Sequence, residues 1–151
     1  MRQAQTLNEA QFRRVLHYCR SRRHSLRDTT IFMISFYAGL RAKEIASLKL
    51  NNVFDETGTV REQFILGTEQ SKGGQRRTVY LNQRLRKTLA EYGASKQLKN
   101  LELPLFASQK GGHFSANTMC QKRWHYLTQQ YQRAKSQNLW CAIYCAIGCL
   151  F

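Results

Sequence analysis

Acidic residues are scarce in this sequence. Nine Asp and Glu stand against 24 Lys and Arg, which gives a formal net charge of +15 over 151 residues. The corresponding pI is about 10.1. An excess of one sign on this scale repels itself unless a polyanion is the partner. The imbalance therefore favours a nucleic-acid-binding protein over a merely soluble basic domain.

Segments typical of secretion or of a membrane span are also missing. The N-terminal stretch "MRQAQTLNEAQFRR" lacks the apolar core of a signal peptide, so we expect a cytoplasmic protein. The final stretch "LWCAIYCAIGCLF", residues 139–151, carries no charge but has only 13 residues. A helix needs about 20 apolar residues to cross a bilayer, so we expect no membrane span.

Paired cysteine motifs such as C-x-x-C are absent, although the chain has five cysteines. An odd number in a reducing compartment predicts free thiols, not a disulfide framework. Cys141, Cys145 and Cys149 share one face if their segment is helical. Small core side chains explain that spacing better than metal ligands do. We expect neither a metal nor a cofactor.

The hydrophobic fraction of 42% is enough for a single core in a chain of this length. Thr6 and Glu9 match a capping box ahead of a first helix with apolar residues at helical spacing. Ser25 repeats the capping pattern before the buried run "TTIFMISFYA", which Gly39 should end. A short third helix is expected to begin near Arg41.

The second half of the chain mixes strand and helix signals. Turn residues follow Leu50, and the runs "TVREQFIL" and "RRTVYLN" predict an antiparallel hairpin with Lys72 near its tip. Helices are expected over "QRLRKTLAEYGASK" and from Ala116, separated by the short extended segment "LPLFAS" and a turn. An apolar stripe on the last helix is typical of a core face: Cys120, Trp124, Leu127 and Tyr131.

These signals predict an α+β fold, mainly helical with a small antiparallel β-hairpin, over residues 1–138. Residues 139–151 differ sharply in composition from the rest and are expected to form a separate apolar tail. Within the predicted domain, the stretch "GLRAKEIASL", residues 39–48, has two possible interpretations.

The first interpretation is a helix-turn-helix, because G-L-x-x-x-E-I-A resembles the support helix of several bacterial regulators. A recognition helix would have to follow after a turn of about 3–4 residues. The next residues are "KLNNVFDETGTV", which favour turns and a strand. A non-enzymatic, helix-turn-helix-like DNA-binding module remains the alternative.

In the second interpretation, the same stretch fits every fixed position of G-[LM]-R-x-x-E-[IL]-x-x-L. This pattern resembles the first catalytic box of the tyrosine recombinase, or phage integrase, family. The resemblance implies that Arg41 grips the scissile phosphate and that Glu44 supports the site. A guanidinium beside the free N–H groups of a helix start suits a phosphate. Glu44, one helical turn on, is expected beneath Arg41, although such a pair is also a common surface feature.

Two later segments extend the resemblance from Thr6 to about Ala134. "QSKGGQRRTVYL" resembles the family's hairpin, which implies that Lys72 donates a proton to the departing 5′ oxygen. "LPLFASQKGGHFSANTM" resembles L-F-x-S-x-x-G-x-x-x-S. The resemblance implies the family's catalytic-domain fold, double-stranded DNA as substrate, and further recombinase protomers as partners.

The family cleaves DNA with a tyrosine hydroxyl and needs neither metal nor nucleotide. It also needs an H-x-x-R box, a G-[HW] site and the tyrosine, all behind the helix that starts at Ala116. H-x-x-R occurs only ahead of Arg41, at residues 17–20 and 24–27. Behind Ala134 there is Tyr144 but no His or Arg. We therefore expect a C-terminally truncated or frameshifted, inactive family member.

Further basic residues could follow a DNA backbone, although a solvated surface explains each of them equally well. His125 is placed among them because it shares the polar side of its expected helix with Lys122. The candidate DNA-binding residues are Arg76, Arg77, Lys110, Lys122, Arg123 and His125.

Overall fold

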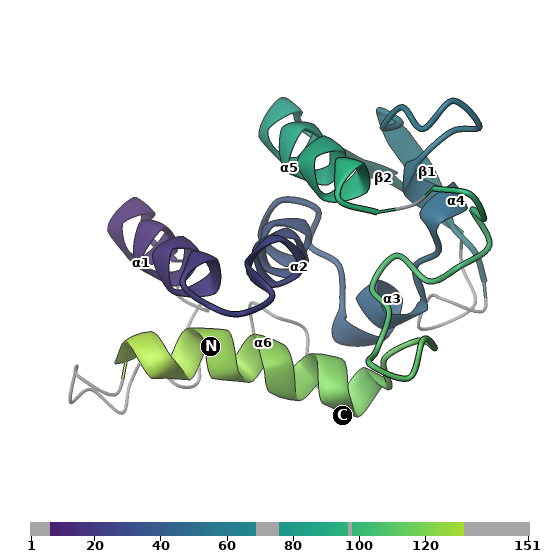
Figure 1. Ribbon diagram of the computed structural model, residues 1–151. Coiled ribbons are helices and arrows are strands. Elements are labelled where there is room, and N and C mark those ends of the chain that lie inside the picture. The colour runs from purple at the N-terminus through teal and green to yellow at the C-terminus, as the bar shows by residue number, and fades with distance from the viewer. Residues whose placement is uncertain (1–6, 69–75, 97, 132–151) are drawn as a thin grey trace.

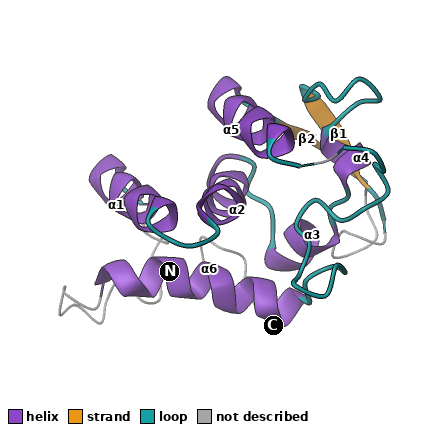
Figure 2. Cartoon of the chain, in the orientation of Figure 1, coloured by secondary structure: helices purple, strands orange, loops and turns teal. Residues whose placement is uncertain are grey.

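The computed structural model describes residues 7–68, 76–96 and 98–131, in which four helices are followed by two strands and then by two further helices (Figure 1; Figure 2). The elements are α1 (Glu9–Arg20), α2 (Ser25–Tyr37), α3 (Ala42–Ser47), α4 (Leu50–Val53), β1 (Gln63–Leu66), β2 (Arg77–Tyr80), α5 (Gln83–Ala94) and α6 (Ala116–Tyr131). The predicted α+β class, mainly helical with a small antiparallel sheet, is confirmed.

The first helix begins with a different cap from the predicted one. The Asn8 side chain accepts a hydrogen bond from the Gln11 backbone N–H at 2.8 Å. The Gln11 side chain accepts one from the Asn8 N–H at 2.9 Å. This reciprocal pair is a capping box two residues later than expected, because Asn caps a helix as well as Thr does. Glu9 is therefore the first helical residue.

The second helix also starts without the expected cap. Ser25 is already helical, and the N-cap residue His24 makes no side-chain capping hydrogen bond. Burial of the apolar run compensates for the missing cap, because Ile31 and Ile34 are almost completely buried. The expected stop is confirmed: α2 ends at Tyr37, and Gly39 has a φ of 61°, which glycine adopts without strain.

The buried helix α2 contacts α1, α3, α5 and α6. In Figure 1, α1 and α5 flank it, and α6 crosses one side of the helical layer. Among the described side chains of α6, Met119 and Tyr126 are buried in the core and Cys120 packs against it. Of the predicted apolar stripe, Cys120 is only half-buried, and the other three side chains lie outside the described residues.

The predicted hairpin is confirmed, although its strands are shorter than the β-rich runs. Phe64 pairs with Val79 on the inner face, and Ile65 pairs with Thr78 on the outer face. Leu50–Val53 forms a single helical turn where only turn chemistry was expected. The Asn52 side chain accepts from the Lys49 N–H at 2.9 Å and caps that turn.

The segment between α5 and α6 is tied to the α3–α4 region by backbone hydrogen bonds. The Leu105 N–H donates to the Leu48 carbonyl at 2.8 Å, and the Leu50 N–H donates to the Leu103 carbonyl at 2.9 Å. Lys49 and Pro104 form an isolated antiparallel bridge there, but "LPLFAS" contains bends and forms no strand. No helix within the described residues is long and apolar enough to cross a membrane. The expected boundary at residues 138–139 lies outside them.

Candidate active site

Arg41 is presented to solvent at the start of α3. The left-handed turn at Gly39 directs Leu40, which is 1% exposed, into the core. Arg41 follows as the exposed N-cap residue. Within the described part of the chain, its guanidinium makes no hydrogen bond or ion pair. Its donors are therefore available to an external anion, as the sequence predicts for a phosphate ligand.

Glu44 is buried, but it does not hold the Arg41 side chain as the sequence suggested. The carboxylate is 3% exposed, and its Oε2 accepts from the Arg41 backbone N–H at 2.7 Å. The prediction that the Glu44 carboxylate lies beneath the Arg41 guanidinium is therefore wrong. Glu44 instead caps the start of α3, and it occupies a backbone N–H that we expected to be free for a phosphate.

The second partner of Glu44 comes from the hairpin. Arg77 Nη2 donates to the same Glu44 Oε2 at 2.9 Å. The Arg77 side chain is 46% exposed, so the contact lies at the edge of the core. A buried carboxylate needs a positive or hydrogen-bonding partner, and Arg77 supplies it across 33 residues. Arg77, predicted as a DNA contact, thus joins β2 to α3.

Two further predicted site residues, Lys72 and Arg76, belong to the hairpin segment. Lys72, the expected proton donor, falls outside the described residues. β1 ends at Leu66 and β2 begins at Arg77, so the predicted location of Lys72 between two paired strands is consistent with the flanking structure. Arg76 is exposed just ahead of β2.

A loop between α5 and α6 reaches α3 from the other direction. His113 Nδ1 lies 3.0 Å from the Ala46 carbonyl oxygen, where it can donate a hydrogen bond. The turn is closed by a hydrogen bond from the Ser108 N–H to the Gly112 carbonyl at 2.8 Å, and Lys110 is exposed on it. No motif surrounds His113 in the sequence, and its proximity to α3 could not be predicted.

The predicted DNA contacts on α6 do not lie on the open, solvated helix face that the sequence suggested. Lys122 packs its ammonium 5.2 Å from the centre of the Phe114 ring. Burial, followed by repulsion from Arg27, lowers the pKa of Lys122. His125 Nε2 lies 2.9 Å from the Tyr18 hydroxyl on α1. Both side chains therefore face the α1–α2 region, and the side chain of Arg123 lies outside the described residues.

A second buried carboxylate, which sequence reasoning missed, organises that region. Asp28 is 1% exposed and lies 3.0 Å from Arg22 Nε and 3.2 Å from Arg27 Nε. The Tyr126 hydroxyl makes no hydrogen bond of acceptable geometry with described residues. Burial, and then the nearby Asp28 carboxylate, raises the Tyr126 pKa above its ordinary value. The sequence feature that could have revealed this cluster is Asp28, the single acid at the end of the arginine-rich stretch "CRSRRHSLRD".

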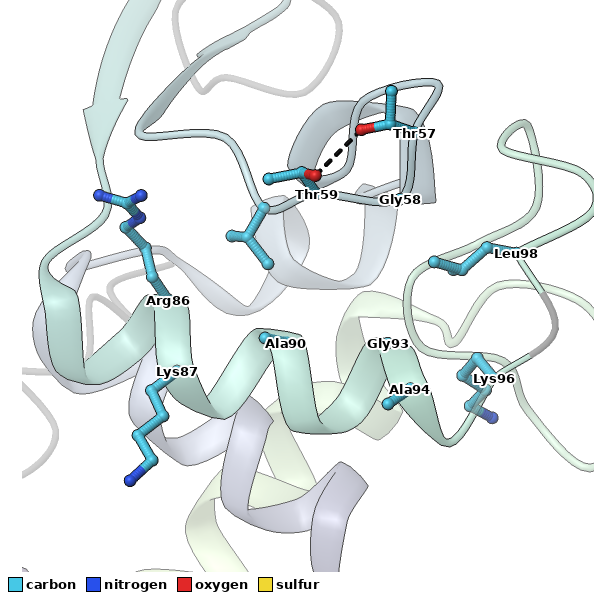
Figure 3. Close-up of a pocket in the computed structure, with 11 residues that line it drawn as sticks. Thr57, Gly58, Thr59, Arg86, Lys87, Ala90, Gly93, Ala94, Lys96 and Leu98 are labelled. Carbon is cyan, nitrogen blue, oxygen red and sulfur yellow. Dashed lines mark hydrogen bonds between the residues drawn. The ribbon is translucent and has the colours of Figure 1, made fainter.

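A cavity of about 610 Å³ lies between α5 and the turn that precedes β1 (Figure 3). Arg86 and Lys87 line it near the start of α5, and Lys96 and Leu98 line its other end. Arg86 is already paired, since its Nη1 lies 3.0 Å from Glu62 Oε1. Neither Arg41 nor Glu44 lines this cavity.

Cysteine chemistry plays no part in the described site. Burial raises the pKa of the Cys19 thiol to about 12, so it stays protonated and is a poor nucleophile. Among the described residues, no three His, Cys, Asp or Glu side chains form a group that could hold a metal. Cys141, Cys145 and Cys149 lie outside those residues.

Comparison with known proteins gives a family and a fold. Residues 5–139 match the model of the phage integrase family. A crystal structure of XerA recombinase resembles this chain with a TM-score of 0.59 and 21% identity. The match covers 90% of this chain and 45% of that one, so this chain spans less than half of that protein. No curated protein matches.

The family match covers most of the chain, and the structural match independently supports the same fold. This chain belongs to the phage integrase family and has the fold of a tyrosine recombinase catalytic domain.

Proposed function

We propose that this chain contacts duplex DNA as part of a site-specific recombinase, with Arg41 as the residue that grips the scissile phosphate. The observation that carries the proposal is the exposed guanidinium of Arg41, which has no partner among the described residues, at the start of a helix anchored by Glu44 and Arg77. A planar guanidinium can donate two parallel hydrogen bonds to phosphate oxygens.

The proposed chemistry is a transesterification at phosphorus. A tyrosine phenolate oxygen attacks the phosphorus, a P–O(Tyr) bond forms, and the bond to the 5′ oxygen breaks. Arg41 stabilises the negative charge on the non-bridging oxygens as the transition state forms. Lys72 donates the proton that the leaving 5′ oxygen takes up. Glu44 is a positioning residue in this scheme, because it acts on the backbone of Arg41 and not on the substrate.

The finer proposal is that these 151 residues bind DNA without cleaving it. Behind Ala134 they contain no H-x-x-R box and no G-H or G-W pair. Loss of a single transition-state donor typically costs about 3 kcal/mol of barrier stabilisation. Tyr144 would therefore be a poor nucleophile even if it reached the phosphate.

Other parts of the proposal concern DNA contacts and partners. Arg76, Arg77 and Lys110 are the predicted DNA contacts that are exposed in the described structure. Arg77 is paired with Glu44, whereas Arg76 and Lys110 lie on loops beside the elements around Arg41. Backbone phosphates would be their targets. We also propose that further recombinase protomers act with this chain on the DNA, in the cytoplasm.

A nicked suicide duplex tests the proposed lack of cleavage. We expect no covalent protein–DNA adduct on a denaturing gel. A phosphotyrosine-type adduct that disappears in Tyr144→Phe would contradict the finer proposal while supporting recombinase chemistry. An adduct that persists in Tyr144→Phe would place the nucleophile elsewhere in the chain.

The alternative is a non-enzymatic DNA-binding module of the helix-turn-helix type. α4 does follow α3, but it has only four residues, which is about one turn and too short to read a major groove. What favours a binding module is the net charge of +15. Arg41→Lys separates the two candidates. A simple binding module should keep its affinity, whereas a site that needs a guanidinium fork should not.

A further inference from the structure

A second cavity, of about 380 Å³, lies between the α1–α2 turn, the end of α5 and the loop before α6. Its volume falls within the range of about 300–1,000 Å³ that is usual for small-molecule sites. None of Arg41, Glu44 and Arg77 lines it. It is therefore distinct from the candidate active site.

The lining of this cavity is basic and contains no acidic residue. Its positively charged or titratable side chains are Arg23, His24, Arg27 and Lys96. The acid closest in sequence, Asp28, is buried beneath the surface and is already shared by Arg22 and Arg27. Arg27 is therefore paired, whereas Arg23 and Lys96 have no acidic partner among the described residues.

Two of the cations are held in place by neighbouring groups. Arg27 packs 5.5 Å from the centre of the Phe114 ring, while its Nε and Nη2 lie 3.2 Å from Asp28 Oδ1. The Lys96 ammonium lies 5.4 Å from the centre of the Tyr92 ring. Ring contacts of this kind orient a cation without neutralising it.

The remaining polar groups are available to a ligand. Arg23 is exposed and has no ion pair or hydrogen bond with the described residues. The hydroxyl groups of Ser25 and Ser108, which also line the cavity, likewise have no hydrogen bond with the described residues. Repulsion from Arg27, with burial and Arg23 next, lowers the pKa of His24, as expected beside uncompensated positive charge.

We propose that this cavity binds a phosphate group, either of a free phosphorylated ligand or of a DNA backbone. Arg23 and Lys96 would provide the charge, and the serine hydroxyls would provide hydrogen bonds. Leu26, 42% exposed, lines the same cavity and offers an apolar contact for the rest of a ligand. Lys96 also lines the cavity in Figure 3, whose arginine, Arg86, is paired with Glu62.

Pyrophosphate and a short duplex are the two probes, applied to the full chain and to two double variants. Arg23→Gln/Lys96→Gln removes two cavity cations, and Arg14→Gln/Lys99→Gln removes the same charge from exposed sites elsewhere. Pyrophosphate affinity is measured by thermal shift and calorimetry at constant ionic strength. Duplex affinity is measured as a function of salt concentration.

If the ligand is a free phosphate compound, pyrophosphate binding saturates and weakens about tenfold or more in the cavity variant only. If the ligand is a DNA backbone, pyrophosphate does not bind, but the salt slope for the duplex falls by about 0.9 per lost contact in the cavity variant only. Equal losses in both double variants, or no loss in either assay, overturn the proposal. Arg41 is unchanged throughout, so failure here leaves the proposed function standing.

Discussion

The two buried carboxylates, Asp28 and Glu44, differ in how far away in the sequence their arginine partners lie. Asp28 is neutralised by Arg22 and Arg27, which lie six residues and one residue away in sequence. Glu44 is neutralised by Arg77, 33 residues away in the hairpin. The first contact stabilises a local turn, whereas the second links two elements that are distant in sequence. Only the second lies beside the proposed phosphate-binding residue.

This difference implies separate roles for the two acids. Removing Asp28 should affect mainly folding, because its partners close the α1–α2 turn. Removing Glu44 should affect both folding and the orientation of α3, because its carboxylate bonds to the Arg41 N–H. Variants of Asp28 should therefore lose stability, whereas variants of Glu44 should lose both stability and DNA binding.

The largest stability loss is expected for Asp28→Ala. Breaking a buried ion pair leaves its partners unpaired and typically costs about 3–5 kcal/mol. Arg22 is 33% exposed and can regain water, so we expect about 3 kcal/mol in urea unfolding. The control is Glu9→Ala, whose pair with Arg13 is exposed on both sides and should have no measurable effect. Equal losses in the two variants would contradict a special role for Asp28.

Glu44→Ala should cost about 2 kcal/mol, because it removes two charge-assisted or capping hydrogen bonds at an edge position. It should also weaken binding to duplex DNA. A double-mutant cycle of Glu44→Gln and Arg77→Gln measures their coupling, which we expect to be about 1 kcal/mol. A coupling energy near zero would mean that the two side chains do not act together.

A smaller effect is expected from pH at the Asp28 cluster. Burial, followed by Arg22, lowers the pKa of His125 below 6.5. The unfolded chain then binds the proton more readily, so stability is complete above pH 6.5 and falls as the pH drops through the lowered pKa. Arg22 donates to the Tyr18 hydroxyl at 2.7 Å, which leaves the Tyr18 proton for His125 Nε2.

Urea unfolding at pH 7.5 and at pH 5.5 measures this effect. The difference between the two values should shrink in His125→Gln. His17→Gln is the control, because it removes an exposed histidine of α1. If the pH dependence of stability is the same in wild type and His125→Gln, the proposal that folding favours an uncharged His125 is wrong.

Several parts of the fold could be predicted from sequence because their signals are local. Helical periodicity marks α1 and α5, and glycine marks the end of α2 at Gly39. The single turn α4 was missed, because it depends on one capping contact from Asn52 to Lys49. On α6, Met119 and Tyr126 are buried and Cys120 packs partly buried against the core. The other three side chains of the predicted stripe lie outside the described residues.

The candidate site was predictable in its residue types but not in its contacts. The motif located Arg41 and Glu44 correctly at the start of a helix. It could not indicate that Glu44 bonds to the Arg41 backbone and to Arg77, because that pairing depends on how the hairpin packs against α3. The contact of His113 with the Ala46 carbonyl likewise depends on how the loop before α6 packs against α3. Contacts of this kind require the folded structure.

The central claim is that Arg41 is a phosphate-binding residue and not an ordinary surface arginine. Duplex DNA affinity as a function of salt, measured for Arg41→Ala and for the exposed control Arg14→Ala, tests it most directly. We expect Arg41→Ala to lose about tenfold in affinity and about 0.9 in salt slope, with unfolding free energy unchanged. Arg14→Ala should change little. Identical behaviour of the two variants would contradict the claim.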